Sequence, residues 1–91
     1  MVGIAAVIVR LMPTGLETDF EKVKHEAIKR LEKHKALNIS FTIEPIAFGL
    51  KAMNIKFAWP EQQDTDVIEH ELSAIEGISS AKIEDYRRAF G

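Results

Sequence analysis

Two stretches in which apolar and polar residues alternate lie on either side of one short apolar segment in the middle of the chain. Every second side chain is apolar in residues 38–44, and the pattern returns in residues 50–59. A period of two is typical of a β-strand with one buried and one solvated face. The two stretches therefore predict a pair of strands that face a core on one side. The residues expected to face inward are Ile39, Phe41, Ile43, Met53, Ile55, Phe57 and Trp59, and those expected outward are Asn38, Ser40, Thr42, Glu44, Leu50, Ala52, Asn54 and Lys56.

The connection between these strands, residues 45–49, has an unusual composition. Pro45 cannot donate to a sheet ladder, and Gly49 permits a backbone conformation that other residues resist. Between them stand Ile46, Ala47 and Phe48, whereas a connection between strands is normally polar. Phe48 is either tucked beneath the turn or held out for a partner. The residues alone leave both alternatives open.

The start of the chain predicts a buried strand. Residues 2–12 are almost continuously apolar and contain several β-branched side chains, with Arg10 as the single charge. Such a run is typical of a central strand covered on at least one face. The segment Pro13–Gly15 is expected to end it.

A helix is predicted after this strand. Thr18 and Glu21 have the spacing of a capping box, in which each side chain bonds the other residue's amide. The helix is expected to end within residues 33–36. Apolar residues at helical spacing form one stripe for the core. They are Leu16, Phe20, Val23, Ala27 and Leu31.

A second helix and a last strand complete the pattern. Asp64 or Thr65 is expected to cap the helix, and Gly77 to follow it in a left-handed conformation. Its core stripe is Ile68, Leu72 and Ile75. The strand is predicted from Ile78 to about Arg88, with Ala81 and Ile83 inward, and Tyr86, Arg87, Arg88 and Phe90 belong to a short tail.

The order of elements is β-α-β-β-α-β. Two βαβ units with right-handed crossovers predict a ferredoxin-like α+β sandwich, in which four antiparallel strands carry both helices on one face. The other face of the sheet is expected to be open. A chain of 91 residues has room for one such domain, residues 1–91.

Charge and composition narrow the classes of function. The chain has no cysteine, which indicates a reducing cytoplasm. A net charge of −2 argues against direct binding of nucleic acid, and the first strand lacks the aromatic residue that an RNA-recognition module stacks on bases. No apolar run approaches the roughly 20 residues of a membrane span.

Motifs of catalysis and cofactor binding are missing from the sequence. Neither G-x-x-x-x-G-K-[ST], G-x-G-x-x-G nor G-x-S-x-G occurs. His25, His34 and His70 form no zinc motif and are expected to be solvated helix residues. The acidic residues of the second helix are expected to form a solvated face. They are Asp64, Asp66, Glu69, Glu71 and Glu76. We therefore expect no catalytic, cofactor or metal site, and a protein that is not an enzyme.

Three segments carry a resemblance to a known family. Residues 44–54 closely resemble the central motif of archaeal elongation factor 1-beta, and residues 72–78 and 85–88 are also similar. The likeness covers essentially the whole chain. It implies a ferredoxin-like fold and an activity as guanine nucleotide exchange factor for elongation factor 1-alpha, the GTPase that delivers aminoacyl-tRNA to the ribosome.

The resemblance also implies roles for single residues. In the related eukaryotic domain the matching aromatic enters an apolar pocket of the GTPase, which assigns that role to Phe48, supported by Pro45, Ile46 and Gly49. The eukaryotic domain ends in a lysine that reaches toward the magnesium and phosphate site. This chain ends in Ala89–Gly91 instead. Arg87 or Arg88 is the candidate for a cation in its place.

Two other functions share this fold class. A ligand-sensing regulatory domain would bind an effector such as an amino acid at the seam of a dimer. A small phosphatase of acylphosphatase type would need a phosphate-cradling loop with an arginine after the first strand. Residues 13–16 contain no arginine, although Arg10 is close, which disfavours the phosphatase.

Overall fold

The computed structural model describes residues 3–90 and contains four strands and two α-helices. The elements follow one another in the predicted order, with a single 3₁₀ turn inserted between the second and third strands. They are β1 (Ile4–Pro13), α1 (Phe20–Lys33), β2 (Leu37–Pro45), η1 (Ala47–Gly49), β3 (Lys51–Pro60), α2 (Asp66–Ser73) and β4 (Ile78–Phe90).

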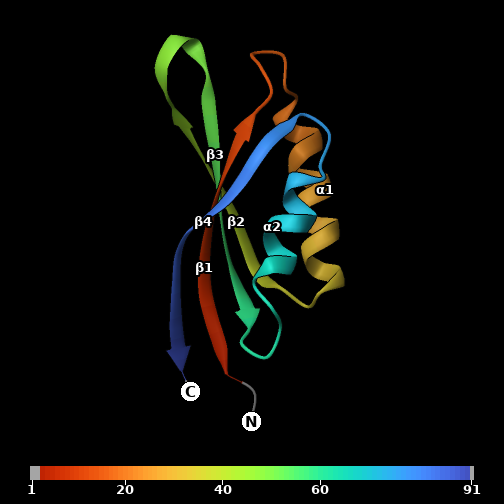
Figure 1. Cartoon of the computed structure of the whole chain (residues 1–91), viewed down its shortest axis with the longest axis vertical. Coiled ribbons are helices and arrows are strands. Elements are labelled where there is room, and N and C mark those ends of the chain that lie inside the picture. The colour runs from red at the N-terminus through yellow and green to blue at the C-terminus, as the bar shows by residue number, and fades with distance from the viewer. Residues whose placement is uncertain (1–2, 91) are drawn as a thin grey trace.

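The strands form one antiparallel sheet in the order β2-β3-β1-β4. Both helices cover the same face of this sheet, and the opposite face carries no helix (Figure 1). The ferredoxin-like α+β sandwich is thereby confirmed. Its two hydrophobic central strands, β1 and β3, are adjacent because each βαβ crossover skips one strand position.

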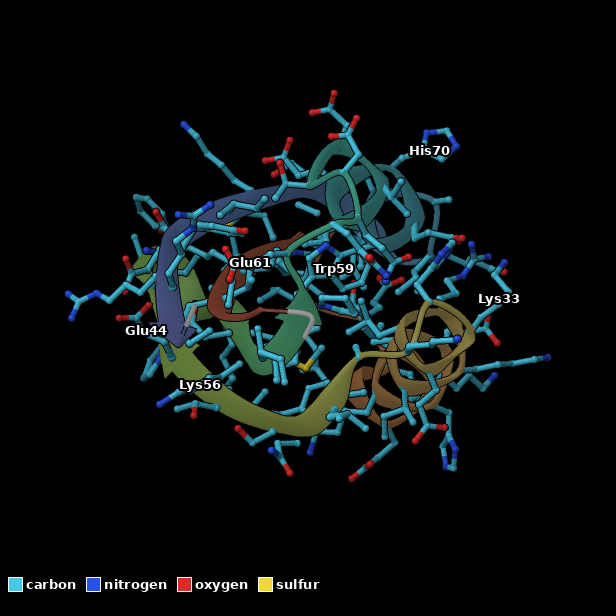
Figure 2. All side chains as sticks on the ribbon, turned by 90° about the horizontal axis from the view of Figure 1, so that it is seen from below. Lys33, Glu44, Lys56, Trp59, Glu61 and His70 are labelled. Atoms are coloured by element: carbon cyan, nitrogen blue, oxygen red, sulfur yellow. The ribbon has the colours of Figure 1, made fainter. Side chains whose placement is uncertain are left out.

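The core lies between the sheet and the helices. Every second residue is buried in β1 from Ala5 and in β3 from Met53, and the register places Val7 opposite Phe57 and Ala5 opposite Trp59. Figure 2 shows Trp59 between the sheet and the helices, while Glu44 and Lys56 lie on the outer side of the sheet. The predicted inward set of β3 is confirmed in full, since Met53, Ile55, Phe57 and Trp59 are all at most 2% exposed.

The predicted capping box of α1 is wrong by one residue. Asp19, not Thr18, caps the helix, because its Oδ1 accepts from the amides of Glu21 and Lys22 at 3.0 and 3.4 Å. Thr18 is engaged elsewhere: its hydroxyl donates to the carbonyl of Gly77 at 3.0 Å. Thr18 therefore makes a tertiary hydrogen bond in place of the capping bond that the local sequence pattern predicted. The helix ends at Lys33, within the predicted range.

The second helix is short and ends earlier than predicted, at Ser73, so that Ile75 and Gly77 lie in the turn that follows it. Asp64 supplies its cap, since Oδ1 accepts from the amide of Asp66 at 3.0 Å, whereas Thr65 makes no side-chain capping bond. Ile68, Leu72 and Ile75 are buried. Gly77 adopts the left-handed conformation, with φ of +95°.

The two ends of the sheet differ from the prediction in detail. The predicted first residue of β1, Val2, lies outside the described residues, and β1 begins at Ile4. Residues 86–90 form no separate tail, because β4 continues to Phe90 and pairs with β1 along its whole length. Backbone hydrogen bonds to β1 hold residues 86–90 in the sheet. The weak alternation of this segment did not indicate that the strand would extend so far.

Candidate functional site

The predicted hairpin turn stands at one end of an elongated molecule. The principal extents are 45 × 22 × 19 Å, and the β2–β3 hairpin rises past the helices at the top of Figure 1. The amide of Ile46 donates to the carbonyl of Leu50 at 2.8 Å, and the amide of Leu50 donates to the carbonyl of Ala47 at 3.1 Å. These two bonds close the turn around Phe48 and Gly49.

Phe48 is held out from the molecule, which excludes the alternative that it is tucked beneath the turn. Phe48 is 94% exposed, the highest value among the large apolar residues whose burial the structure describes. Its backbone is left-handed, with φ 59° and ψ 34°. For a residue with a side chain this conformation costs about 1–2 kcal/mol. The turn thus carries local strain and gains almost no burial from its phenylalanine.

The other predicted turn residues support this arrangement. Pro45 pairs with Lys51 at the last rung of the β2–β3 ladder, where its missing amide disturbs nothing further. Gly49 follows Phe48 with a second positive φ, +78°. Consecutive left-handed residues are rarely formed without glycine, so Gly49 is what permits the backbone to present Phe48 outward. Pro45, Ile46, Phe48 and Gly49 are therefore brought together in one turn.

Leu16 lies beside this turn, contrary to the prediction that it belongs to the core stripe of α1. It is 70% exposed, in the loop between β1 and α1. A Cβ placed on Gly49 would lie 3.6 Å from Leu16 Cδ2. Since α1 begins only at Phe20, Leu16 precedes the helix and the helical period does not apply to it. Ile43, predicted inward, is also 37% exposed.

A groove adjoins Leu16 on the helix side. Its volume is about 840 Å³, and it lies between the β1–α1 loop, α1 and the turn that follows α2. Residues 14–19 and 74–77 line it together with Lys22, Glu26 and Arg30. Most of these side chains are polar, and no motif in the sequence indicated the groove.

The structure does not bring Arg87 and Arg88 to the turn. Arg87 pairs with Ala6, which also pairs with Ala58, seven residues along β3 from the turn-proximal Lys51. At a rise of about 3.3 Å per residue, that separation is about 23 Å. The C-terminal end of β4 accordingly lies at the opposite end of the molecule from the turn (Figure 1).

Both arginines are exposed and each has an acidic partner. Their side chains are 79% and 78% exposed for Arg87 and Arg88. Arg87 Nε lies 3.0 Å from Asp85, and Arg88 Nε contacts Glu61. The Arg87–Asp85 pair is largely exposed and therefore weak, whereas Arg88 pairs with a Glu61 side chain that is only 14% exposed.

On the open face of the sheet, Arg10 links three strands. Its guanidinium lies 3.4 Å from Glu44 on β2 and 3.7 Å from Glu84 on β4. To reach Glu44 from β1 the side chain must cross β3, and Ala52, which pairs with Glu44, lies on that path. This explains why Ala52 is 0% exposed although the alternation predicted it to be solvated.

The prediction of a solvated acidic face on α2 is wrong for two of its residues. Glu71 lies between the helices, with a side chain only 13% exposed, and Glu69 Oε2 accepts from the amide of Ile83 at 3.1 Å. Three basic groups at the C-terminal end of α1 and its cap surround Glu71: His34 Nε2 at 2.8 Å, Arg30 Nη1 at 3.0 Å and Lys33 Nζ at 3.2 Å. The hydrogen bond from His34, followed by those from Lys33 and Arg30, outweighs desolvation and lowers the pKa of Glu71 to about 2.

This cluster joins α1 to α2 and has a structural role. It also corrects the expectation for His34, whose side chain is 26% exposed and whose ring lies 6.1 Å from that of Trp59. Within residues 3–90 no group of three or more histidine, aspartate or glutamate side chains has the arrangement of a metal site. No helix in this range is long and apolar enough to cross a membrane.

Comparison with known proteins gives one family. Residues 6–89 match the family described as the EF-1 guanine nucleotide exchange domain. A protein named elongation factor 1-beta from Metallosphaera sedula is 40% identical over 79 residues, which cover 85% of this chain and 86% of the relative. Another of the same name, from Methanothermobacter thermautotrophicus, is 33% identical over 87 residues and covers 94% and 97% of the two chains. These matches confirm the family that the central motif indicated.

Proposed function

Because the chain belongs to the family of EF-1 guanine nucleotide exchange domains, we propose that it promotes the release of GDP from elongation factor 1-alpha. It would act as a binding protein, with no bond chemistry of its own. Such an activity places it in the cytoplasm, where translation occurs, and requires no direct contact with nucleic acid.

The observation that carries the mechanism is the presentation of Phe48. Phe48 is 94% exposed at a projecting turn, so its apolar ring contacts water in the free protein and its burial by a partner would be favourable. The turn holds the ring outward before binding, so little conformational entropy is lost on association. We assign Phe48 as the residue that enters an apolar pocket of the GTPase, with Pro45, Ile46 and Gly49 shaping the turn.

The size of the effect requires more than one residue. An exchange factor works by binding the nucleotide-free GTPase more tightly than the nucleotide-bound form, and nucleotide weakens its binding by the same factor. Accelerating release a thousandfold takes about 4 kcal/mol of differential stabilisation. Burial of one phenylalanine supplies about 1.5–3 kcal/mol. Further contacts around the turn must supply the remainder.

Arg87 and Arg88 complete the proposal as cations for the magnesium and phosphate site. Because they lie at the far end of the sheet from Phe48, they would contact a different part of the GTPase. The interface would then follow the long axis of the molecule, which measures 45 Å. Their own acidic partners, Asp85 and Glu61, would be exchanged for phosphate oxygens, which arginine binds strongly.

The direct test measures the release of a fluorescent GDP analogue from elongation factor 1-alpha of the same organism, with and without this protein. We expect a rate that rises with the concentration of the added protein and saturates. An unchanged release rate at saturating protein would refute the function. The double variant Arg87→Ala/Arg88→Ala then tests the cations separately: a lower maximal rate supports them, and an unchanged one removes them from the mechanism.

A further inference from the structure

We infer that Leu16, in the loop between β1 and α1, is a second apolar anchor that contacts the GTPase beside Phe48. This inference rests on the proposed exchange function and deepens it. Among the residues whose burial the structure describes, Leu16 and Phe48 are the two most exposed large apolar residues, at 70% and 94%. They belong to segments 32 positions apart in the sequence, yet Leu16 lies beside Gly49, the residue after Phe48: a Cβ placed on Gly49 would be 3.6 Å from Leu16 Cδ2.

The loop that carries Leu16 is fixed in place by the turn after α2. The amide of Thr14 and the hydroxyl of Thr18 both donate to the carbonyl of Gly77, at 2.9 and 3.0 Å. The amide of Thr18 also donates to the carbonyl of Gly15, at 3.5 Å. Leu16 therefore stands at the apex of a loop that is tied down on both sides, while its own side chain stays largely in solvent.

This combination points to a partner for Leu16 outside the chain. A leucine that served the fold would be covered, and the stripe residues Val23, Ala27 and Leu31 are each at most 1% exposed. Leu16 instead extends the apolar surface of the turn toward the helix side. Leu16 and Phe48 lie on two separate segments at one end of the molecule, an arrangement that fits one continuous apolar surface on a partner. Leu16 would therefore contact the GTPase surface beside the pocket that receives Phe48.

The experiment compares GDP release with four proteins: the wild type, Leu16→Ala, Phe48→Ala and the double variant. The matched control is Leu37→Ala, because Leu37 is 59% exposed at the opposite end of β2 from the turn. We expect Leu16→Ala to lower stimulated release about threefold to tenfold, as for loss of part of a buried leucine. Leu37→Ala should leave it unchanged. Thermal unfolding of all five proteins verifies that each is folded.

The double variant separates direct contact from support of the turn. If Leu16 contacts the GTPase itself, Leu16→Ala lowers release by a similar factor in the Phe48→Ala background. If Leu16 only positions Phe48, its removal has no further effect there, and the inference is overturned. An effect of Leu16→Ala no larger than that of Leu37→Ala also overturns it, while leaving the exchange function intact. A wild type that does not stimulate release removes the function and the inference together.

Discussion

Replacing Phe48 by alanine should separate function from stability more sharply than any other single change in this chain. The side chain is 94% exposed, so its removal takes almost no buried area from the fold. Alanine keeps the same left-handed strain, because that strain arises from the Cβ atom, which both residues have. The free energy of unfolding should therefore change by less than about 0.5 kcal/mol.

The effect on exchange follows from the area that the partner would cover. Full burial of a phenylalanine is worth about 1.5–3 kcal/mol, which at 1.4 kcal/mol per tenfold corresponds to a loss of about 10-fold to 150-fold. The loss should show as a lower rate of GDP release at fixed, subsaturating protein. If Phe48 acts in the transition state for release rather than in ground-state binding, the maximal rate falls as well.

The assay combines stopped-flow release of a fluorescent GDP analogue with thermal unfolding of the same samples. Leu37→Ala, an exposed leucine far from the turn, serves as the control for loss of an exposed apolar side chain. The reasoning would be refuted if Phe48→Ala unfolded with the loss of about 3–5 kcal/mol typical of a core truncation while exchange stayed at the wild-type rate.

Three further predictions concern the scaffold. Glu71→Gln should lower the melting temperature at neutral pH, because a carboxylate with a pKa lowered to about 2 stabilises the fold only while it is ionised. The difference in melting temperature from the wild type should therefore shrink as the pH falls from 4.5 toward 2. A difference that does not depend on pH in thermal scans would contradict this. Gly77→Ala should cost about 1–2 kcal/mol in chemical denaturation, since φ is +95° and the new Cβ would lie 3.1 Å from Thr18 Cγ2; an unchanged denaturation midpoint would count against the strain. Arg10→Ala should cost about 1 kcal/mol through loss of two partly exposed ion pairs and of the cover over Ala52. Part of that cost should disappear in 1 M salt, and a cost equal at low and high salt would show that the ion pairs contribute nothing.

The sequence by itself determined the order and the faces of the elements. Alternation in residues 53–59 and the continuous apolar run of the first strand identified the two central strands, because these patterns depend only on the period of the backbone and on burial. The unusual composition of the turn also marked Phe48 as a residue that needed an explanation. A resemblance in the same segment then indicated the family that comparison confirmed.

Only the tertiary structure decided where the surface residues lie relative to one another. Leu16 lies beside Gly49, and Glu71 contacts three basic groups at the end of α1 and its cap. Arg87 and Arg88 lie about 23 Å along the strands from the turn. Thr18 likewise leaves the helix cap for the carbonyl of Gly77. Each of these outcomes depends on contacts between segments remote in the chain. A local sequence pattern reflects the period of its own helix or strand. It carries no information about which remote segment packs beside that element in the folded protein.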